Sequence, residues 1–241
     1  MVRLDRYVDA LRRGEVVALP TDTVYGLAAL ASNHAACRRV FALKQRPGGI
    51  ALPVLVGEID QALALAAEEA APRLARVAHR FWPGPLTIVV PRRAGLGLEL
   101  GGDERSIGLR CPAEPSAREI CRRAGPIATT SANRHGASPC RSAAEVRAVF
   151  GDLLEFVLDA GWRDGQPSSV VSLVHEPPVL LRAGPVVLDA VVEVLDVAQP
   201  EPHGAALGSA PARLEGEAPP RERDRAEPPE ANDEEIVPRP G

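Results

Sequence analysis

The feature that most constrains the fold is an alternation of short apolar runs with segments in which apolar residues recur at helical spacing. The apolar runs are short enough for strands, and each is closed by Pro, Gly or a polar residue. They lie at residues 15–19, 52–56, 86–90, 106–110, 126–130, 155–158, 170–174 and 179–181. Because strands separated by helices form sheets covered on both faces, this pattern predicts an α/β fold. The last strands follow one another closely, which predicts a mixed sheet.

Three predicted helices begin with a capping signal. Asn33 precedes a helical segment that runs to about Gln45, and Asn is a favoured N-cap residue. Ser116 and Ser142 are each followed three residues later by Glu. This is the capping-box pattern, in which both side chains satisfy free N–H groups at a helix start. We therefore predict helices at these three residues, besides one over residues 5–13.

Composition is typical of a globular protein with an aliphatic core. Hydrophobic residues make up 45% of the 241 residues, but aromatic residues only 3%, so Val, Leu, Ile and Ala must fill the interior. There is no run of eighteen apolar residues and no apolar signal segment at the N-terminus, which favours a cytoplasmic protein without membrane contact. The four cysteines and five histidines show no metal-ligand spacing, so we expect buried free thiols and no protein-bound metal.

The end of the chain differs from the rest. Residues 199–241 hold ten acidic residues, five arginines, nine of the 24 prolines and no aromatic residue. Their net charge is −5, which leaves about +1 on residues 1–198. Such a segment cannot bury enough apolar surface to offset the entropy of ordering it. We therefore predict one folded domain over residues 1–198 and a disordered, Pro-rich acidic tail over residues 199–241.

Two polar loops carry paired groups that suit anions. Lys44 and Arg46 lie at a predicted helix end, where an ammonium and a guanidinium can bind one phosphate or carboxylate. The alternative is that they stabilise the helix C-terminus. Ser131 and Asn133 follow a predicted strand and have no His–Asp pair beside them, which favours binding over nucleophilic attack. They could equally form a local turn.

Further polar groups lie where strands begin or end, as ligand sites of α/β sheets do. The segment Thr21–Gly26 offers hydroxyls and a carboxylate for a small polar substrate, or uses them for its own backbone. Arg110 and Arg182 end strands, where an Arg is more often a surface charge, and Ser168 opens a strand. No G-x-x-x-x-G-K-[ST] or G-x-G-x-x-G motif is present, so these segments alone do not predict nucleotide binding.

The segments are weak singly and specific in combination and order. From residue 19 to residue 184 the chain reads LPTDTVYGL, KQRP, FWPGPLTIVV, IGLRCP, TTSANRHG, PSSVV and LLRAG. This series resembles the YrdC-like family of L-threonylcarbamoyladenylate synthases in its single-domain form. The most telling pieces are the K-x-R of Lys44 and Arg46 and the S-x-N of Ser131 and Asn133.

The resemblance implies an open, twisted α/β sheet with a concave, positively lined site. It implies a nucleotidyltransferase that makes threonylcarbamoyl-AMP and pyrophosphate from L-threonine, bicarbonate and ATP, with Mg²⁺ bound through the ATP phosphates. The product would serve a threonylcarbamoyl-transferase complex that modifies tRNA. By resemblance, the catalytic residues are Lys44, Arg46, Ser131 and Asn133; ATP contacts are these four with Ser106, Ser138 and Arg182; threonine contacts are Thr23, Arg110, Thr129 and Ser168.

The sequence also departs from the family pattern, since Ile50 and Leu55 stand where members often have Asn and His. Two other functions remain open. One is a non-enzymatic module that binds double-stranded RNA through phosphates. The other is a paralogue that acts on another carbamoylated substrate. A domain charge near +1 and few aromatic residues argue against RNA binding, whereas the combined K-x-R and S-x-N favour the synthase.

Overall fold

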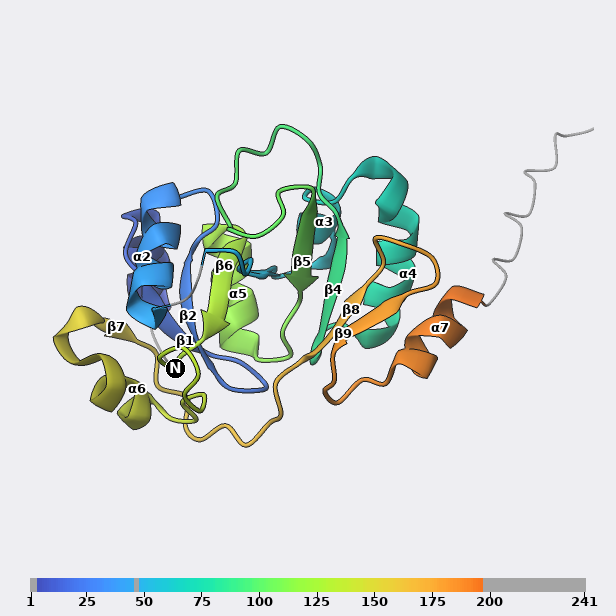
Figure 1. The fold of residues 1–241 in the computed structure, drawn as a ribbon. Helices are drawn as coiled ribbons and strands as arrows, with labels where there is room; N and C mark the ends of the chain where they lie inside the picture. The colour runs from blue at the N-terminus through green and yellow to red at the C-terminus, as the bar shows by residue number, and fades with distance from the viewer. Residues whose placement is uncertain (1–3, 46–47, 197–241) are drawn as a thin grey trace, which may run out of the picture. The chain divides into compact units, whose positions relative to one another are not determined.

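The computed structural model describes residues 4–45 and 48–196 (Figure 1). The strands are β1 Val17–Pro20, β2 Tyr25–Leu30, β3 Val54–Leu55, β4 Leu86–Pro91, β5 Ser106–Arg110, β6 Ile127–Ser131, β7 Phe156–Val157, β8 Ser169–Ser172 and β9 Val179–Arg182. The α-helices are α1 Asp5–Arg12, α2 His34–Lys44, α3 Ile59–Leu63, α4 Ala71–Phe81, α5 Pro115–Ala124, α6 Ala143–Phe150 and α7 Leu188–Asp196. Short 3₁₀ turns lie at Glu68–Ala70 and Gly151–Leu153. The predicted tail, residues 199–241, lies outside the described residues.

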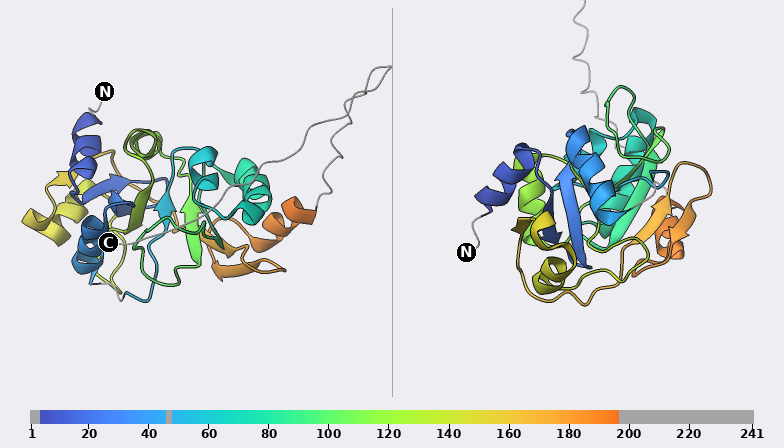
Figure 2. Two further views of the ribbon diagram at one scale, coloured as in Figure 1. Left: turned by 90° about the horizontal axis from the view of Figure 1, so that it is seen from above. Right: turned by 60° about the vertical axis from the view of Figure 1, so that its left-hand side comes forward.

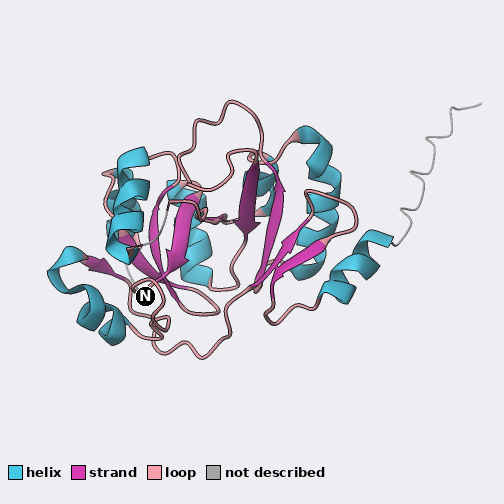
Figure 3. Ribbon diagram, in the orientation of Figure 1, coloured by secondary structure: helices cyan, strands magenta, loops and turns pink. Residues whose placement is uncertain are grey.

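All nine described strands join one sheet in the order β7-β1-β2-β6-β3-β5-β4-β8-β9. The pairs β1–β7, β3–β5 and β4–β8 are parallel, and the other five neighbouring pairs are antiparallel. The sheet is therefore mixed, and the predicted α/β fold class is confirmed. Figure 3 shows the helices flanking this sheet and the loops gathering where the arrowheads of β5 and β6 point.

Helices pack on both faces because successive strand residues face opposite ways. Along β1, Ala18 belongs to a core with α2, α4 and α6, whereas Val17 and Leu19 belong to a second core with α1 and α5. The helix pairs α1–α5 and α4–α7 also contact each other. The left view of Figure 2 shows α1 and α5 on one side of the strands and α2 on the other. Both cores are mainly aliphatic, as composition predicts.

The predicted helix starts are confirmed at two positions and wrong at one. The Asn33 side chain accepts the N–H of Ala36, and Ser142 accepts the N–H of Glu145. The helix predicted from Ser116 instead begins at Pro115 and is capped by Glu114, whose carboxylate accepts from the backbone and hydroxyl of Ser116. Pro suits the first helical position because it has no backbone N–H that needs a partner there, and the cap lies two residues earlier than predicted, at Glu114.

The main omission of the sequence prediction is β2, a central strand between β1 and β6. Its sequence, YGLAAL, is rich in Gly and Ala, which have low strand propensity, and its first five residues are all buried. Strand β2 therefore lacks the alternation of apolar and polar residues that marks a half-buried strand. Gly26 is required there, since a Cβ would come within 2.9 Å of the Thr129 hydroxyl on β6. The expected loop over residues 20–26 is in fact a tight turn between two paired strands.

The cysteine prediction is confirmed, because Cys37, Cys111, Cys121 and Cys140 are all free and buried. Burial raises the pKa of the Cys37 thiol to about 11. Trp82 has a structural role, because it is buried and its indole N–H donates to the Leu86 carbonyl at 2.7 Å. No helix in the described part of the chain is long and apolar enough to span a membrane.

Candidate functional site

Lys44 is buried at the end of α2 and points to the end of β6. Its Nζ donates to the backbone oxygen of Ser131 at 2.8 Å, to the Ser131 hydroxyl at 3.0 Å and to the Asn133 amide oxygen at 2.6 Å. Only 3% of the residue is exposed. These contacts bring three of the predicted catalytic residues together. They also rule against the alternative in which Lys44 merely stabilises the helix C-terminus.

The helix end and the loop after β6 hold each other in place. Gln45 ends α2 in the left-handed region at φ 56°. The N–H of His135 donates to the Lys44 carbonyl at 2.7 Å, and the Arg134 guanidinium donates to the Leu43 carbonyl at 2.6 Å. Residues 134 and 135 thus satisfy carbonyls that a helix C-terminus leaves free. The Lys44 side chain is fixed because its own backbone is fixed.

Asn133 forms the local turn that was one of its two predicted roles, and it also contacts the buried Lys44. Its Nδ2 donates to the carbonyls of Arg134 and Ala137 at 3.0 and 2.6 Å, which closes a local turn. Its Oδ1 faces Lys44 and also accepts from the Ser131 hydroxyl at 2.7 Å. The turn therefore orients the amide, and the amide orients the lysine. An anion that binds Lys44 would have to approach beside these neutral oxygens.

A second cationic group lies at the end of β5. Arg110 is 6% exposed, and its Nε donates to the Gly84 carbonyl at 3.0 Å. Its Nη1 donates to the Thr23 hydroxyl at 3.1 Å, and its Nη2 to the Asp22 carboxylate at 2.7 Å. Burial lowers the pKa of Arg110, and the charge of Asp22 opposes that shift. Arg110 is thus no surface charge, and the predicted threonine contacts Thr23 and Arg110 do meet.

Ser168 and Arg182 form the third contact among predicted residues. The Ser168 hydroxyl lies 2.9 Å from the Thr87 hydroxyl and accepts from Arg182 Nη2 at 2.9 Å. Arg182 also donates from Nε and Nη2 to the Ser168 carbonyl. Burial lowers the pKa of Arg182, and the positive charge of Arg110 lowers it further. The guanidinium of Arg182 is thus held on the backbone and hydroxyl of Ser168.

Sheet pairing connects the group formed by Lys44, Ser131 and Asn133 (the lysine group) with the group formed by Arg110 and Thr23 (the arginine group). Gly26 of β2 pairs with Ser131 of β6, and the turn before β2 carries Thr23, which contacts Arg110. The hydroxyl of Thr129, two residues before Ser131, donates to the Leu27 carbonyl of β2 at 3.0 Å. Figure 1 shows the β1–β2 turn and the ends of β5 and β6 on the same side of the molecule. The candidate site is this edge.

Three other predicted residues are not gathered by any described contact. Ser106 begins β5, four residues from Arg110, and pairs with Pro91. Ser138 is exposed in the loop after Asn133. Arg46 lies outside the described residues. Their assignment to ATP remains a prediction.

Three further residues shape the site. The sequence offers the Asp22 carboxylate only as part of the segment Thr21–Gly26, and it predicts no role for Thr87 or Gly165. Asp22 holds Arg110, and Thr87 holds Ser168. Gly165 lies so close to the β1–β2 turn that a Cβ would come within 2.6 Å of the Asp22 carbonyl and 2.8 Å of Thr23 Cα. Asp22 could have been found from its place in the turn. Nothing in the local sequence of Gly165 signals a contact across more than 140 positions.

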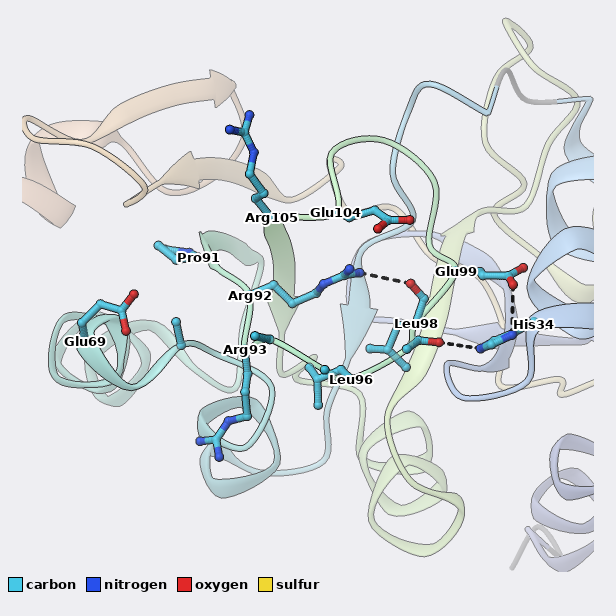
Figure 4. A pocket seen from close by; sticks show the side chains of 14 residues that line it. His34, Glu69, Pro91, Arg92, Arg93, Leu96, Leu98, Glu99, Glu104 and Arg105 are labelled. Carbon is cyan, nitrogen blue, oxygen red and sulfur yellow. Dashed lines mark hydrogen bonds and ion pairs between the residues drawn. The ribbon is translucent and has the colours of Figure 1, made fainter.

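A pocket of about 760 Å³ lies elsewhere, at the connection between β4 and β5 (Figure 4). It contains none of the predicted site residues. Its charged side chains already bind within the protein: Arg92 donates to the Leu98 carbonyl, and His34 contacts Glu99 and the Gly97 carbonyl. Acidic and basic groups both line it. We therefore place the candidate site at the polar edge described above.

Replacing Gly165 by Ala should displace the segment that covers the β1–β2 turn, because the added Cβ would meet backbone atoms. We expect a loss of about 1–3 kcal/mol in the free energy of unfolding, measured by urea denaturation. Gly49→Ala is the matched control, since nothing lies within 4 Å of its added Cβ. Equal stability of the Gly165→Ala and Gly49→Ala variants would contradict the described packing.

Comparison with known proteins identifies the family. Residues 9–184 match the Sua5/YciO/YrdC family, described as telomere recombination. A threonylcarbamoyl-AMP synthase of Chromohalobacter salexigens is 37% identical over 172 residues, covering 71% of this chain and 92% of that protein. The threonylcarbamoyl-AMP synthase of Pyrococcus abyssi is 36% identical over 187 residues, covering 77% of this chain.

The chain spans 55% of the length of the Pyrococcus relative. The structure of P. abyssi Sua5 complexed with L-threonine has a TM-score of 0.73 and 34% identity, covering 80% of this chain and 57% of that one. The resemblance inferred from the motifs is thus confirmed. This chain belongs to the Sua5/YciO/YrdC family.

Proposed function

We propose that this protein is an L-threonylcarbamoyladenylate synthase, a nucleotidyltransferase that joins L-threonine, bicarbonate and ATP. The single observation that carries the proposal is that one edge of the sheet combines the Lys44–Ser131–Asn133 group with the Arg110–Thr23 group. Relatives that match most of this chain are threonylcarbamoyl-AMP synthases, and this supports the same activity here.

We propose that L-threonine binds at the Arg110–Thr23 group, which we call the threonine end of the site. Threonine carries a carboxylate and a hydroxyl, and Arg110 suits a carboxylate because a guanidinium donates in a planar fork. The hydroxyls of Thr23 and Ser168 lie beside Arg110 and Arg182 respectively. Thr129 completes the proposed threonine contacts from β6. The structure of P. abyssi Sua5 complexed with L-threonine supports this ligand for the fold.

The lysine group is the proposed phosphate end. Lys44 can exchange one of its contacts with neutral oxygens for a contact with an ATP phosphate, while its remaining contacts with Ser131 and Asn133 keep it oriented. Arg46, Ser106, Ser138 and Arg182 are further proposed ATP contacts. Among the described residues, no group of three or more Asp, Glu, His or Cys could hold a metal ion. Mg²⁺ would therefore be held by phosphates and water, where it would neutralise phosphate charge.

The proposed chemistry needs no enzyme nucleophile. The threonine amine and bicarbonate condense to an N-carboxy adduct with loss of water. A carboxylate oxygen of that adduct attacks the α-phosphorus of ATP, forming the mixed anhydride and releasing pyrophosphate. Three anionic partners must meet, so Lys44, Arg110 and Arg182 would screen their repulsion and hold them in line. The adduct is unstable in water, so it is best consumed where it forms.

The product would pass to a threonylcarbamoyl-transferase complex that modifies tRNA. We place the enzyme in the cytoplasm, where ATP and tRNA are available. The catalytic unit would be residues 1–198. Weak RNA binding at the cationic edge would be compatible with this role.

Pyrophosphate release from ATP should require both L-threonine and bicarbonate, with L-serine a poor substitute.

Arg110→Lys should raise the KM for threonine about tenfold or more, because the bidentate contact is lost. Lys44→Met should instead lower kcat by about a hundredfold or more by removing charge near the phosphates. No release by folded protein with Mg²⁺ present would contradict the proposal and favour the paralogue or RNA-binding alternatives.

Deleting residues 199–241 should leave activity nearly unchanged, because the described residues contain both charged groups of the site. The measurement compares kcat/KM for threonine in the full chain and in residues 1–198. A tenfold loss in the shortened protein would show that the catalytic unit extends beyond residue 198.

A further inference from the structure

Asp22 is the only carboxylate in ion-pair contact with Arg110 among the described residues. Its Oδ1 accepts from Arg110 Nη2 at 2.7 Å and from the backbone N–H of Ala113 at 2.9 Å. The side chains of Arg110 and Asp22 are 7% and 17% exposed. An ion pair this buried loses much hydration, so its stability contribution alone does not explain its presence. Its position beside the proposed threonine end suggests a geometric task.

The turn that carries Asp22 is itself firmly held. The Thr21 hydroxyl donates to the Val24 carbonyl at 2.7 Å and lies 2.9 Å from the Thr23 hydroxyl. Gly165 packs against the carbonyl of Asp22 from the other side. Asp22 is therefore fixed by its backbone, and it can impose an orientation on the longer arginine side chain.

The contacts of Arg110 leave a defined part of its guanidinium for a ligand. A guanidinium has five N–H donors. Contacts with Gly84, Thr23 and Asp22 use one donor on each nitrogen among the described residues. One N–H remains on Nη1 and one on Nη2, and either can donate to an oxygen of a ligand carboxylate.

Charge balance points the same way. Asp22 offsets the positive charge of Arg110 in their ion pair, and Arg182 carries a further positive charge at Ser168. The three groups together carry +1, which a single carboxylate neutralises. Without Asp22, Arg110 would lose one of its three fixed points and would be free to turn away from Arg182.

We propose that Asp22 is a positioning residue of the synthase: it does not touch threonine, but it orients Arg110 to receive the threonine carboxylate. This inference rests on the proposed function. The opposing view is that Asp22 only repels the substrate carboxylate, in which case removing its charge would tighten threonine binding. A purely structural role would weaken all ligands alike.

The test is Asp22→Asn, which keeps the acceptor for the Ala113 N–H and removes the charge. We expect the KM for L-threonine to rise about tenfold or more, because a charge-assisted contact that holds Arg110 is lost. The competitive inhibition constant of L-threoninamide, which lacks the carboxylate, and the KM for ATP should change less than about threefold. Asp22→Glu should recover part of the threonine KM.

Asp103→Asn is the matched control, because Asp103 forms an exposed ion pair with Arg105 away from the site. A threonine KM unchanged or lowered by Asp22→Asn would overturn the proposal. So would equal weakening of threonine, threoninamide and ATP together with a lower Tm. If the wild type releases no pyrophosphate, the proposed function fails separately. Calorimetric binding of L-threonine to wild type and to the Asp22→Asn variant then still decides the role of Asp22.

Discussion

The structure depends on how the sheet accommodates two buried cations, Lys44 and Arg110. A buried charge is costly unless other groups replace the water it loses. Lys44 meets backbone, hydroxyl and amide oxygens at the end of β6, and Arg110 meets a carbonyl, a hydroxyl and a carboxylate at the end of β5. Both sets of partners come from chain segments far away in sequence. The two cations are therefore satisfied only when the fold brings these distant segments together at one edge of the sheet.

Much of the fold follows from local sequence, and the failures have physical causes. Strands such as β4 and β5 were predicted because their apolar runs are short and closed by Pro. Strand β2 was missed because Gly and Ala carry little strand propensity, and its identity comes from the pairing with β6. The predicted start of α5 differs from the observed one by two residues, because Pro115 takes the first helical position and Glu114 the cap.

The site was predictable as a set of motifs but not as a geometry. The order of segments from the β1–β2 turn to the end of β9 pointed to the family, and comparison confirms it. Spacing alone could not show that Lys44 reaches Ser131 and Asn133, since 87 residues separate the first pair. It also gave Arg110 a surface role, whereas packing buries it against Asp22. Such contacts are set by sheet order, which single-sequence patterns do not contain.

The central claim is that one edge of the sheet holds threonine at Arg110 and the ATP phosphates at Lys44. A crystal structure with L-threonine and a non-hydrolysable ATP analogue tests it most directly. We expect the threonine carboxylate on Arg110, beside Thr23, and phosphate oxygens within hydrogen-bond distance of Lys44 and Ser131. Either ligand in the pocket between β4 and β5, with the Arg110 edge empty, would contradict it.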